Sequence, residues 1–416
     1  MGKSGNNAFL FVIVTVMLDM MGFGLIVPVI PALLTELSGL SAEEAVVWGG
    51  ALTATYALMN FIAGPTMGNL SDRFGRRPVL LASIGTLAID FLIMGFANTL
   101  AILFVGRALA GISSATFSTA NAYIADVTTP EERGRAFGFT GAAFGLGFII
   151  GPAAGGLLAE AFGTRAPFFV AAGLAGINFL YGVFVLPESL VPEKRRAFEW
   201  RRANPLGAFK HFRRVPGVAW FLLVIGLFAL SNSVYPSTWN FHSVIRYGWS
   251  EGEIGASLAL VGLGAAIMQA GVLGMIIKRI GLVRTIAVGV TFNTIAMVSF
   301  AFASEPWMAY AFIPLASIGG ILGPSVNAMV SNLTPEDAQG ELQGASASLQ
   351  SLAIVFAPLM MTQTLHAFSK DDAIIHFPGA AFLLSASLMA LCTVPFLLGL
   401  RANGFRLMGT EKVPGK

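Results

Sequence analysis

Three charged residues stand inside long apolar stretches of the sequence. Asp19 and Asp90 each lie near the middle of such a stretch, and Arg107 lies within another. At about 1.5 Å per helical residue, each aspartate would stand roughly 15–18 Å from one end of its helix, near the middle of a bilayer. A charge at that depth costs about 2.5–3.5 kcal/mol, so these side chains must face a cavity or one another.

A carboxyl group in such a place can take part in proton transfer, because its protonation switches when its access to water changes. We expect Asp19 or Asp90 to take up a proton, and Arg107 to adjust how tightly that proton is held. The alternative is a structural Asp–Arg pair that only locks the helices together.

Long apolar helices must position these residues. Hydrophobic residues make up 55% of the chain and charged residues 11%, whereas soluble domains carry about 25% charged residues. The surroundings are therefore expected to be lipid, where a spanning helix needs about 20 apolar residues. The sequence predicts an all-α membrane protein of twelve transmembrane helices, over residues 9–35, 46–68, 79–97, 101–124, 136–160, 166–186, 217–243, 253–277, 285–303, 307–331, 342–367 and 378–401.

The distribution of Lys and Arg predicts the orientation. With both termini in the cytoplasm, 21 of the 25 basic residues fall on the cytoplasmic side, and only Arg165, Arg246 and Lys370 fall in outer loops. This bias follows the positive-inside rule. It also accounts for the net charge of +3 without a nucleic-acid partner, because the basic loops face an anionic leaflet.

The chain repeats itself at an offset of about 206 residues. Gly68, Arg73 and Gly75 return as Gly274, Arg279 and Gly281, and Pro152 returns as Pro358. We therefore expect an N-terminal six-helix bundle over 1–186, a cytoplasmic linker over 187–216, and a C-terminal six-helix bundle with a short tail over 217–416. Such a parallel repeat predicts a binding site between the halves and alternating access by rocking.

The loop between the second and third predicted helices carries glycines, a proline and charges at close spacing. Glycine permits a tight turn, and an acid before a helix interacts with its positive end. We expect this loop to form a cytoplasmic gate whose arginines pair with a carboxylate at the end of the fourth helix; topology anchoring alone is the alternative. The expected gate residues are Gly68, Asp72, Arg73, Gly75, Arg76, Arg77 and Asp126.

The fifth predicted helix carries small residues at four-residue spacing, a pattern that lets two helices approach closely in lipid. A plain packing face is the alternative to a functional motif. The residues are Gly141, Gly145, Gly147, Gly151, Pro152, Gly155 and Gly156.

Several of these motifs resemble those of one family. The segment 68–77 resembles the signature G-x-x-x-D-R-x-G-R-R of the major facilitator superfamily, and 141–156 resembles the motif of its drug/proton antiporter branch. Residues 18–31, 56–60, 166–169 and 186–189 resemble bacterial tetracycline/proton antiporters. The resemblance implies a twelve-helix fold, proton-driven export and a bacterial inner membrane. It also implies that Asp19 and Asp90 matter for transport and that Arg107 is linked to proton transfer.

The C-terminal half departs from the tetracycline pattern. The ninth predicted helix has Asn293 but lacks the carboxylate of that family, and Gln269 stands near the place of a histidine found in some members. Asn60 replaces the usual glutamine in the second helix. Amides and aromatic residues are thus the candidate substrate contacts, with interhelical hydrogen bonding as the alternative for each. They are Asn60, Tyr235, Trp239, Asn240, Gln269, Asn293, Asn327 and Gln350.

The sequence favours a carrier over other classes. It contains no nucleophile–base pair, no metal cluster and no phosphate-binding loop, so we expect neither an enzyme nor an ATP-driven pump, and no cofactor. The proton gradient is the expected driving force, and a tetracycline-type substrate would bring its own divalent metal. Proton-coupled export of tetracycline-like or other amphiphilic drugs, by a monomer, is the main hypothesis. A metabolite carrier of the same fold is the alternative.

Overall fold

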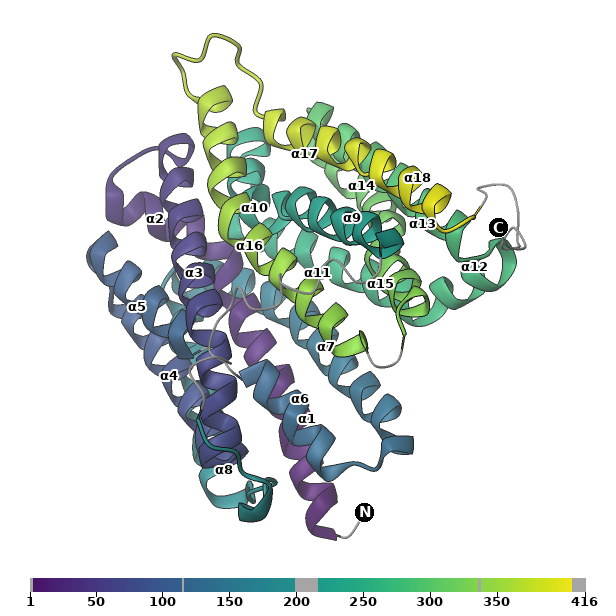
Figure 1. Ribbon diagram of the computed structural model, residues 1–416. Helices are drawn as coiled ribbons and strands as arrows, with labels where there is room; N and C mark the ends of the chain where they lie inside the picture. The colour runs from purple at the N-terminus through teal and green to yellow at the C-terminus, as the bar shows by residue number, and fades with distance from the viewer. Residues whose placement is uncertain (1–2, 114–115, 199–215, 336–337, 406–416) are drawn as a thin grey trace. The chain divides into compact units, whose positions relative to one another are not determined.

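The computed structural model describes residues 3–113, 116–198, 216–335 and 338–405 (Figure 1). Within these ranges the regular structure is helical, and no strand occurs. The expected all-α class is therefore confirmed. The chain divides into two compact units, Met1–Pro205 with Trp249–Gly262, and Leu206–Gly248 with Leu263–Lys416. The predicted linker 187–216 falls at this division, and its residues 199–215 lie outside the described ranges.

Unit 1 contains the helices of the N-terminal half and the beginning of α11. Within it, α1 packs chiefly against α7, α4 against α8, and α3 against α5. Its helices are α1 (Lys3–Ile26), η1 (Val27–Val29), α2 (Ile30–Ser38), α3 (Ala42–Phe74), α4 (Arg76–Phe96), α5 (Leu100–Ser113), α6 (Thr116–Val127), α7 (Pro130–Phe162), α8 (Ala166–Val185) and η2 (Pro192–Lys194).

Unit 2 contains the helices of the C-terminal half. Here α13 packs against α14 and α17, and α9 packs against α16, α18 and α17. The helices that follow η2 are α9 (Pro216–Asn232), α10 (Val234–Tyr247), α11 (Glu251–Ile267), the π-helical segment η4 (Met268–Val272), α12 (Leu273–Ile280), α13 (Leu282–Phe302), α14 (Pro306–Gly319), α15 (Leu322–Leu333), α16 (Gln339–Ser369), α17 (Ala380–Leu391) and α18 (Thr393–Ala402).

Eleven helical segments of the described chain are long and apolar enough to cross a membrane. The stretch predicted as the fourth span is divided into α5 and α6, because residues 114–115 between them lie outside the described ranges; α5 alone is a shorter apolar helix. The chain is thus a multi-pass membrane protein. Twelve spans and cytoplasmic termini stay predictions.

Two helices extend beyond their predicted spans. The second span was expected over 46–68, but α3 continues to Phe74, and the fifth was expected over 136–160, but α7 begins at Pro130. The polar ends of both helices carry backbone hydrogen bonds outside the apolar core, where hydropathy gives no signal. Asp72 and Arg73 consequently lie in the last turn of α3 rather than in a loop.

Candidate functional site

Asp90 and Arg107 form an ion pair in unit 1. Asp90 lies on α4 and is fully buried, and Arg107 of α5 bonds to its Oδ2 atom. The guanidinium of Arg107 also lies over the ring of Tyr56, with 5.7 Å between its Cζ atom and the ring centroid. Gly106 leaves room for the carboxylate, because a Cβ atom there would stand 2.8 Å from Asp90 Oδ1. The charge of Asp90 is therefore compensated within the membrane.

Asp19 lies apart from this pair, on α1. Its side chain is buried and hydrogen-bonds with Thr116 of α6. Among the residues that the structure describes, no cation forms an ion pair with it. Asp19 is thus a buried carboxylate that lacks a described positive partner.

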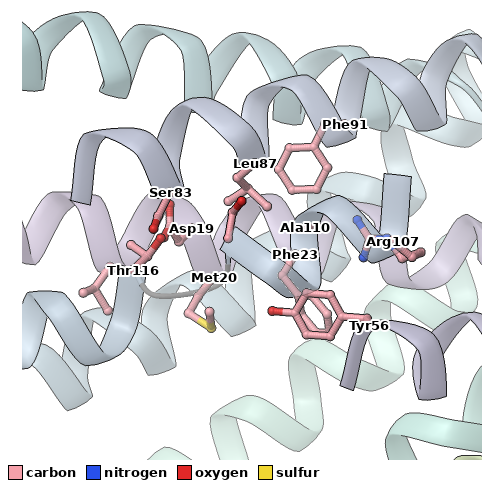
Figure 2. Close-up of a pocket in the computed structure, with 12 residues that line it drawn as sticks. Asp19, Met20, Phe23, Tyr56, Ser83, Leu87, Phe91, Arg107, Ala110 and Thr116 are labelled. Atoms are coloured by element: carbon pink, nitrogen blue, oxygen red, sulfur yellow. The ribbon is translucent and has the colours of Figure 1, made fainter. Parts of the chain in front are cut away.

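A cavity of about 110 Å³ connects the surroundings of Asp19 and Arg107. Figure 2 shows Asp19, Ser83 and Thr116 together at one end, and Tyr56 and Arg107 at the other. The volume is sufficient for ordered water and small for a drug. The remaining lining residues are Val16, Met20, Phe23, Leu87, Phe91, Ala110 and Ser113. The cavity thus borders both Asp19 and the Arg107 of the neighbouring ion pair.

The expected gate residues are joined at the α3–α4 turn. Arg76 pairs with Asp72, at 2.6 Å from Nη1 to Oδ1, and with Asp126, at 3.2 Å from Nε to Oδ2. Its Nη1 atom also donates to Ser71 Oγ at 3.0 Å. The predicted carboxylate partner at the end of the fourth helix is thus brought to Arg76. Arg77 instead donates to the Val183 carbonyl oxygen at 2.7 Å.

The acid at the beginning of α4 is Glu188 rather than Asp72. Its carboxylate accepts hydrogen bonds from the backbone nitrogens of Arg76, at 2.8 Å, and Arg77, at 3.3 Å. Asp72 was expected to interact with this helix end, but α3 includes it and its side chain turns to Arg76. Gly75, with φ 108° and ψ 161°, makes the turn, and a Cβ atom there would meet the Glu188 carboxylate. Among the described residues, no atom lies within 4 Å of the place that a Cβ atom at Gly68 would take. The Cζ atom of Arg73 lies 5.1 Å from the centroid of the Phe74 ring.

The glycine motif of α7 has one face against α1. A Cβ atom at Gly147 would stand 2.9 Å from Met20 Cβ, and one at Gly151 would stand 2.8 Å from Gly24 Cα. A Cβ atom at Gly155 would likewise stand 2.8 Å from Leu25 Cα. These close approaches explain why α1 and α7 run side by side (Figure 1).

The other motif residues differ. Gly156 lies against the beginning of α11, where a Cβ atom at Gly156 would stand 2.8 Å from Gly252 Cα. Pro152 lies against Gly24 of α1, because a Cβ atom at Gly24 would stand 2.6 Å from Pro152 Cδ. Gly141 and Gly145 have nothing within 4 Å of their Cβ positions in the described part of the chain. The close approach of two helices expected at this motif is therefore found in its second part, because residues 141 and 145 lie about 120° around the helix from 147 and 151.

Two predicted substrate contacts line a second cavity, which lies in unit 2. Asn327 of α15 and Gln350 of α16 line a space of about 220 Å³. The sequence did not single out Asn232 and Ser233, which supply further polar groups at the α9–α10 break. The remaining lining residues are Ile225, Phe228, Ala229, Pro236, Gly323, Val326 and Ile354. The cavity thus offers amides and a hydroxyl within apolar walls.

Other candidate contacts lie elsewhere. Tyr235 and Trp239 pack in an aromatic cluster with Phe300 and Phe382, at ring distances of 5.1–6.1 Å. Asn293 is buried where α13 crosses Gly319 of α14, and its Oδ1 atom has no described hydrogen-bond partner. Three predicted substrate contacts remain. Asn60 on α3 and Asn240 on α10 are half-buried, and Gln269 is exposed in the π-helical segment. Within unit 2, Tyr235, Trp239, Asn240, Gln269 and Asn293 do not line the Asn327–Gln350 cavity.

Some residues of these sites were missed because their roles arise from tertiary contacts. Glu188 follows α8 in an irregular segment, 112 residues from Arg76. Glu160 lies in the last turn of α7 and accepts hydrogen bonds from Ser250 Oγ, at 2.6 Å, and Gly252 N, at 3.1 Å, at the beginning of α11. Both resemble ordinary surface acids in sequence. Thr116 had only its place near the end of an apolar run as a signal. Among the described residues, no group of three or more His, Cys, Asp or Glu could hold a metal ion.

Apolar spanning helices, an intramembrane Asp–Arg pair and a second buried carboxylate on a cavity define a multi-pass membrane protein of the carrier class. The family model of the Major Facilitator Superfamily matches residues 12–358. The chain belongs to this superfamily, whose members are transporters.

Relatives match over nearly the whole chain. The class C tetracycline resistance protein of Escherichia coli is 41% identical, over 93% of this chain and 96% of the relative. The class B protein of Escherichia coli is 35% identical, over 96% and 98%. Multidrug resistance protein 2 of Bacillus subtilis (strain 168) is 30% identical, over 85% and 87%.

Solved structures show the same fold at low identity. The human organic anion transporter MFSD10 (TETRAN) superposes with a TM-score of 0.69 at 24% identity, covering 95% of this chain and 99% of that chain. The nucleoside transporter NupG gives a TM-score of 0.77 at 12% identity, covering 94% and 99%. The family fold expected from the sequence motifs is thereby confirmed.

Proposed function

We propose that the chain exports tetracycline-like or other small amphiphilic drugs in exchange for protons, by alternating access. The observation that carries the proposal is Asp19, a buried carboxylate without a described cationic partner on the wall of an intramembrane cavity. The names of the relatives, tetracycline resistance and multidrug resistance proteins, support the substrate class and favour it over a metabolite.

The two aspartates have different roles in this proposal. Protonation of Asp90 would leave the buried charge of Arg107 without its partner, which is unfavourable in a dry interior. Protonation of Asp19 breaks no ion pair. Asp19 is therefore the proton carrier, and the Asp90–Arg107 pair is the fixed charge that shapes the field around it.

Coupling follows from competition for Asp19. A bound proton neutralises the carboxylate, and so does a cationic group or metal chelate on the substrate. Each state of the carrier thus holds one of the two, and export of one molecule admits a proton. Water in the cavity between Asp19 and Arg107 supplies the proton route.

The polar surfaces for the substrate come from amides. Asn327 and Gln350 line the unit 2 cavity, and Asn60 of α3 presents an amide in the same unit as Asp19. The remaining predicted contacts, Tyr235, Trp239, Asn240, Gln269 and Asn293, stay candidates that substitution can test.

The remaining features of the proposal rest on the sequence and the family. The excess of basic residues on one side supports cytoplasmic termini, and the chain length with its internal repeat supports two six-helix bundles joined by the 187–216 linker. Bacterial tetracycline resistance relatives support an inner-membrane location. The protein acts as a monomer and uses no cofactor, and a divalent metal enters only with the substrate.

Accumulation of tetracycline in inverted membrane vesicles tests the proposal. Vesicles energised to acidify their interior should accumulate the drug, and a proton uncoupler should abolish accumulation. Asp19→Asn should abolish it at normal protein level, whereas Lys370→Gln, which removes an exposed charge, should retain it. Uptake that persists with the uncoupler, or with Asp19→Asn, would contradict proton exchange at Asp19. Silence toward a drug panel, with proton-driven uptake of a metabolite, would establish the alternative carrier.

A further inference from the structure

A basic cavity lies in unit 2 where α12 meets α13. It has a volume of about 390 Å³ and is lined by Lys278 and Arg279 at the end of α12 and by Arg284 in the first turn of α13. Asn332 and Phe405 form part of its wall. None of the described residues that line it is acidic. The cavity therefore combines cationic side chains with the positive end of a 21-residue helix.

The same junction occurs in unit 1, between α3 and α4. Gly75 and Gly281 adopt similar backbone conformations, with φ and ψ of 108° and 161°, and of 80° and 162°. Each glycine nitrogen donates to a carbonyl four residues earlier, at 3.1 Å for Gly75 and 2.9 Å for Gly281. The sequence repeat is thus also a repeat of local structure.

In unit 1 the chain fills this junction with its own carboxylates. Glu188, three residues after the end of α8, binds the backbone nitrogens of Arg76 and Arg77. Asp126, the penultimate residue of α6, and Asp72, three residues before Gly75, both pair with Arg76. An anionic oxygen is therefore a demonstrated occupant of the space in front of this kind of helix start.

In unit 2 all three acids are replaced. Phe405 stands three residues after the end of α18, Asn332 is the penultimate residue of α15, and Lys278 stands three residues before Gly281. The space that Glu188 occupies beside Gly75 is open beside Gly281, where nothing in the described part of the chain lies within 4 Å of the Cβ position. Among the described residues, the repeated junction in unit 2 thus keeps its basic side chains and has none of the three acids that accompany them in unit 1.

We propose that an anionic phosphate group binds in this cavity, and that it is the headgroup of an anionic membrane phospholipid. The phosphate oxygens would take the place of the Glu188 carboxylate, facing the first nitrogens of α13, with Lys278 and Arg279 around them. Basic pockets on the cytoplasmic side of membrane proteins recruit anionic headgroups from the leaflet. The inference rests on the proposed orientation but on neither the proposed substrate nor proton exchange, so failure of one leaves the other intact.

Native mass spectrometry of the delipidated full-length protein in detergent tests the site. Titration with phosphatidylglycerol should show one tight binding step that phosphatidylcholine lacks. Lys278→Gln and Arg279→Gln should each weaken that step about five-fold, the effect of one basic residue near an anionic surface. Lys370→Gln, an equal loss of charge at an exposed site, should leave it unchanged.

A second variant supplies the missing carboxylate instead of removing a basic side chain. Phe405→Glu puts a carboxylate where Glu188 stands in unit 1, so it should abolish the phosphatidylglycerol-specific step while the protein stays folded. Equal binding of the two lipids by the unmodified protein, or an undiminished preference in Arg279→Gln and Phe405→Glu, would overturn the proposal. Inorganic phosphate at millimolar concentration that removes the bound lipid completely would overturn the lipid as the source and leave a free-anion site.

Discussion

Gly75 and Gly281 allow the contribution of the Glu188 contact to be measured by substitution. Both glycines lie in a backbone region that is essentially restricted to glycine, where another residue costs about 1–3 kcal/mol. Gly75→Ala and Gly281→Ala should therefore share this strain. Only at Gly75 does the new methyl group also meet the Glu188 carboxylate.

Displacement of that carboxylate removes the cap of α4. Glu188 accepts from Arg76 N at 2.8 Å and Arg77 N at 3.3 Å, and loss of a helix cap costs about 0.5–2 kcal/mol. Gly75→Ala should thus lower the free energy of unfolding by about 1.5–5 kcal/mol, compared with about 1–3 kcal/mol for Gly281→Ala.

The assay is unfolding of the purified, delipidated protein in mixed detergent micelles. The extra loss of unfolding free energy in Gly75→Ala, relative to Gly281→Ala, should shrink when both variants are made in a Glu188→Ala background, because the cap is then already absent. Equal destabilisation by the two glycine substitutions, or the same excess in both backgrounds, would refute the assignment of Glu188 as the cap.

Three further outcomes follow from the packing of the membrane helices. Gly155→Ala should lower the free energy of unfolding by about 1–3 kcal/mol, because the new methyl group meets the Leu25 backbone. Gly145→Ala, whose methyl group meets no described atom, should leave the free energy of unfolding unchanged or raise it slightly. Thermal unfolding of the two purified variants distinguishes these outcomes. Arg107→Ala should destabilise by about 3–5 kcal/mol, since it leaves the buried Asp90 charge unpaired, and Asp90→Asn in the same chain should restore most of that loss. Arg76→Gln should increase protease cleavage of the 186–196 segment in membranes, because it releases Asp126, which also accepts from Ser189 Oγ; unchanged cleavage would mean that the Arg76–Asp126 contact does not hold the segment.

Much of the fold could be predicted because lipid imposes long apolar helices. The charges that such helices rarely tolerate were also recognisable, and the Asp90–Arg107 pair appears as one of the two arrangements expected. The Arg76–Asp126 contact followed from the position of an acid at the end of a helix beside a basic loop.

The remainder depends on contacts that spacing does not encode. Glu188 reaches α4 from an irregular segment, so no periodic pattern marks it. In α7 the sequence contains two stripes of glycine, and the position of α1 decides that Gly147, Gly151 and Gly155 are packed, whereas Gly141 and Gly145 have no described neighbour at their Cβ positions. Trp239 is of a residue type that often contacts ligands, but the packing of α10 places its ring against those of Phe300 and Phe382.

Proton movement driven by the substrate tests the central claim most directly. Purified protein in liposomes, with a pH-sensitive dye inside, would be given a tetracycline gradient and no imposed pH gradient. The account predicts that drug flow in one direction moves protons in the other, that Asp19→Asn abolishes this movement, and that Lys370→Gln does not. Drug flow with no change of internal pH, or full proton movement in Asp19→Asn, would contradict it.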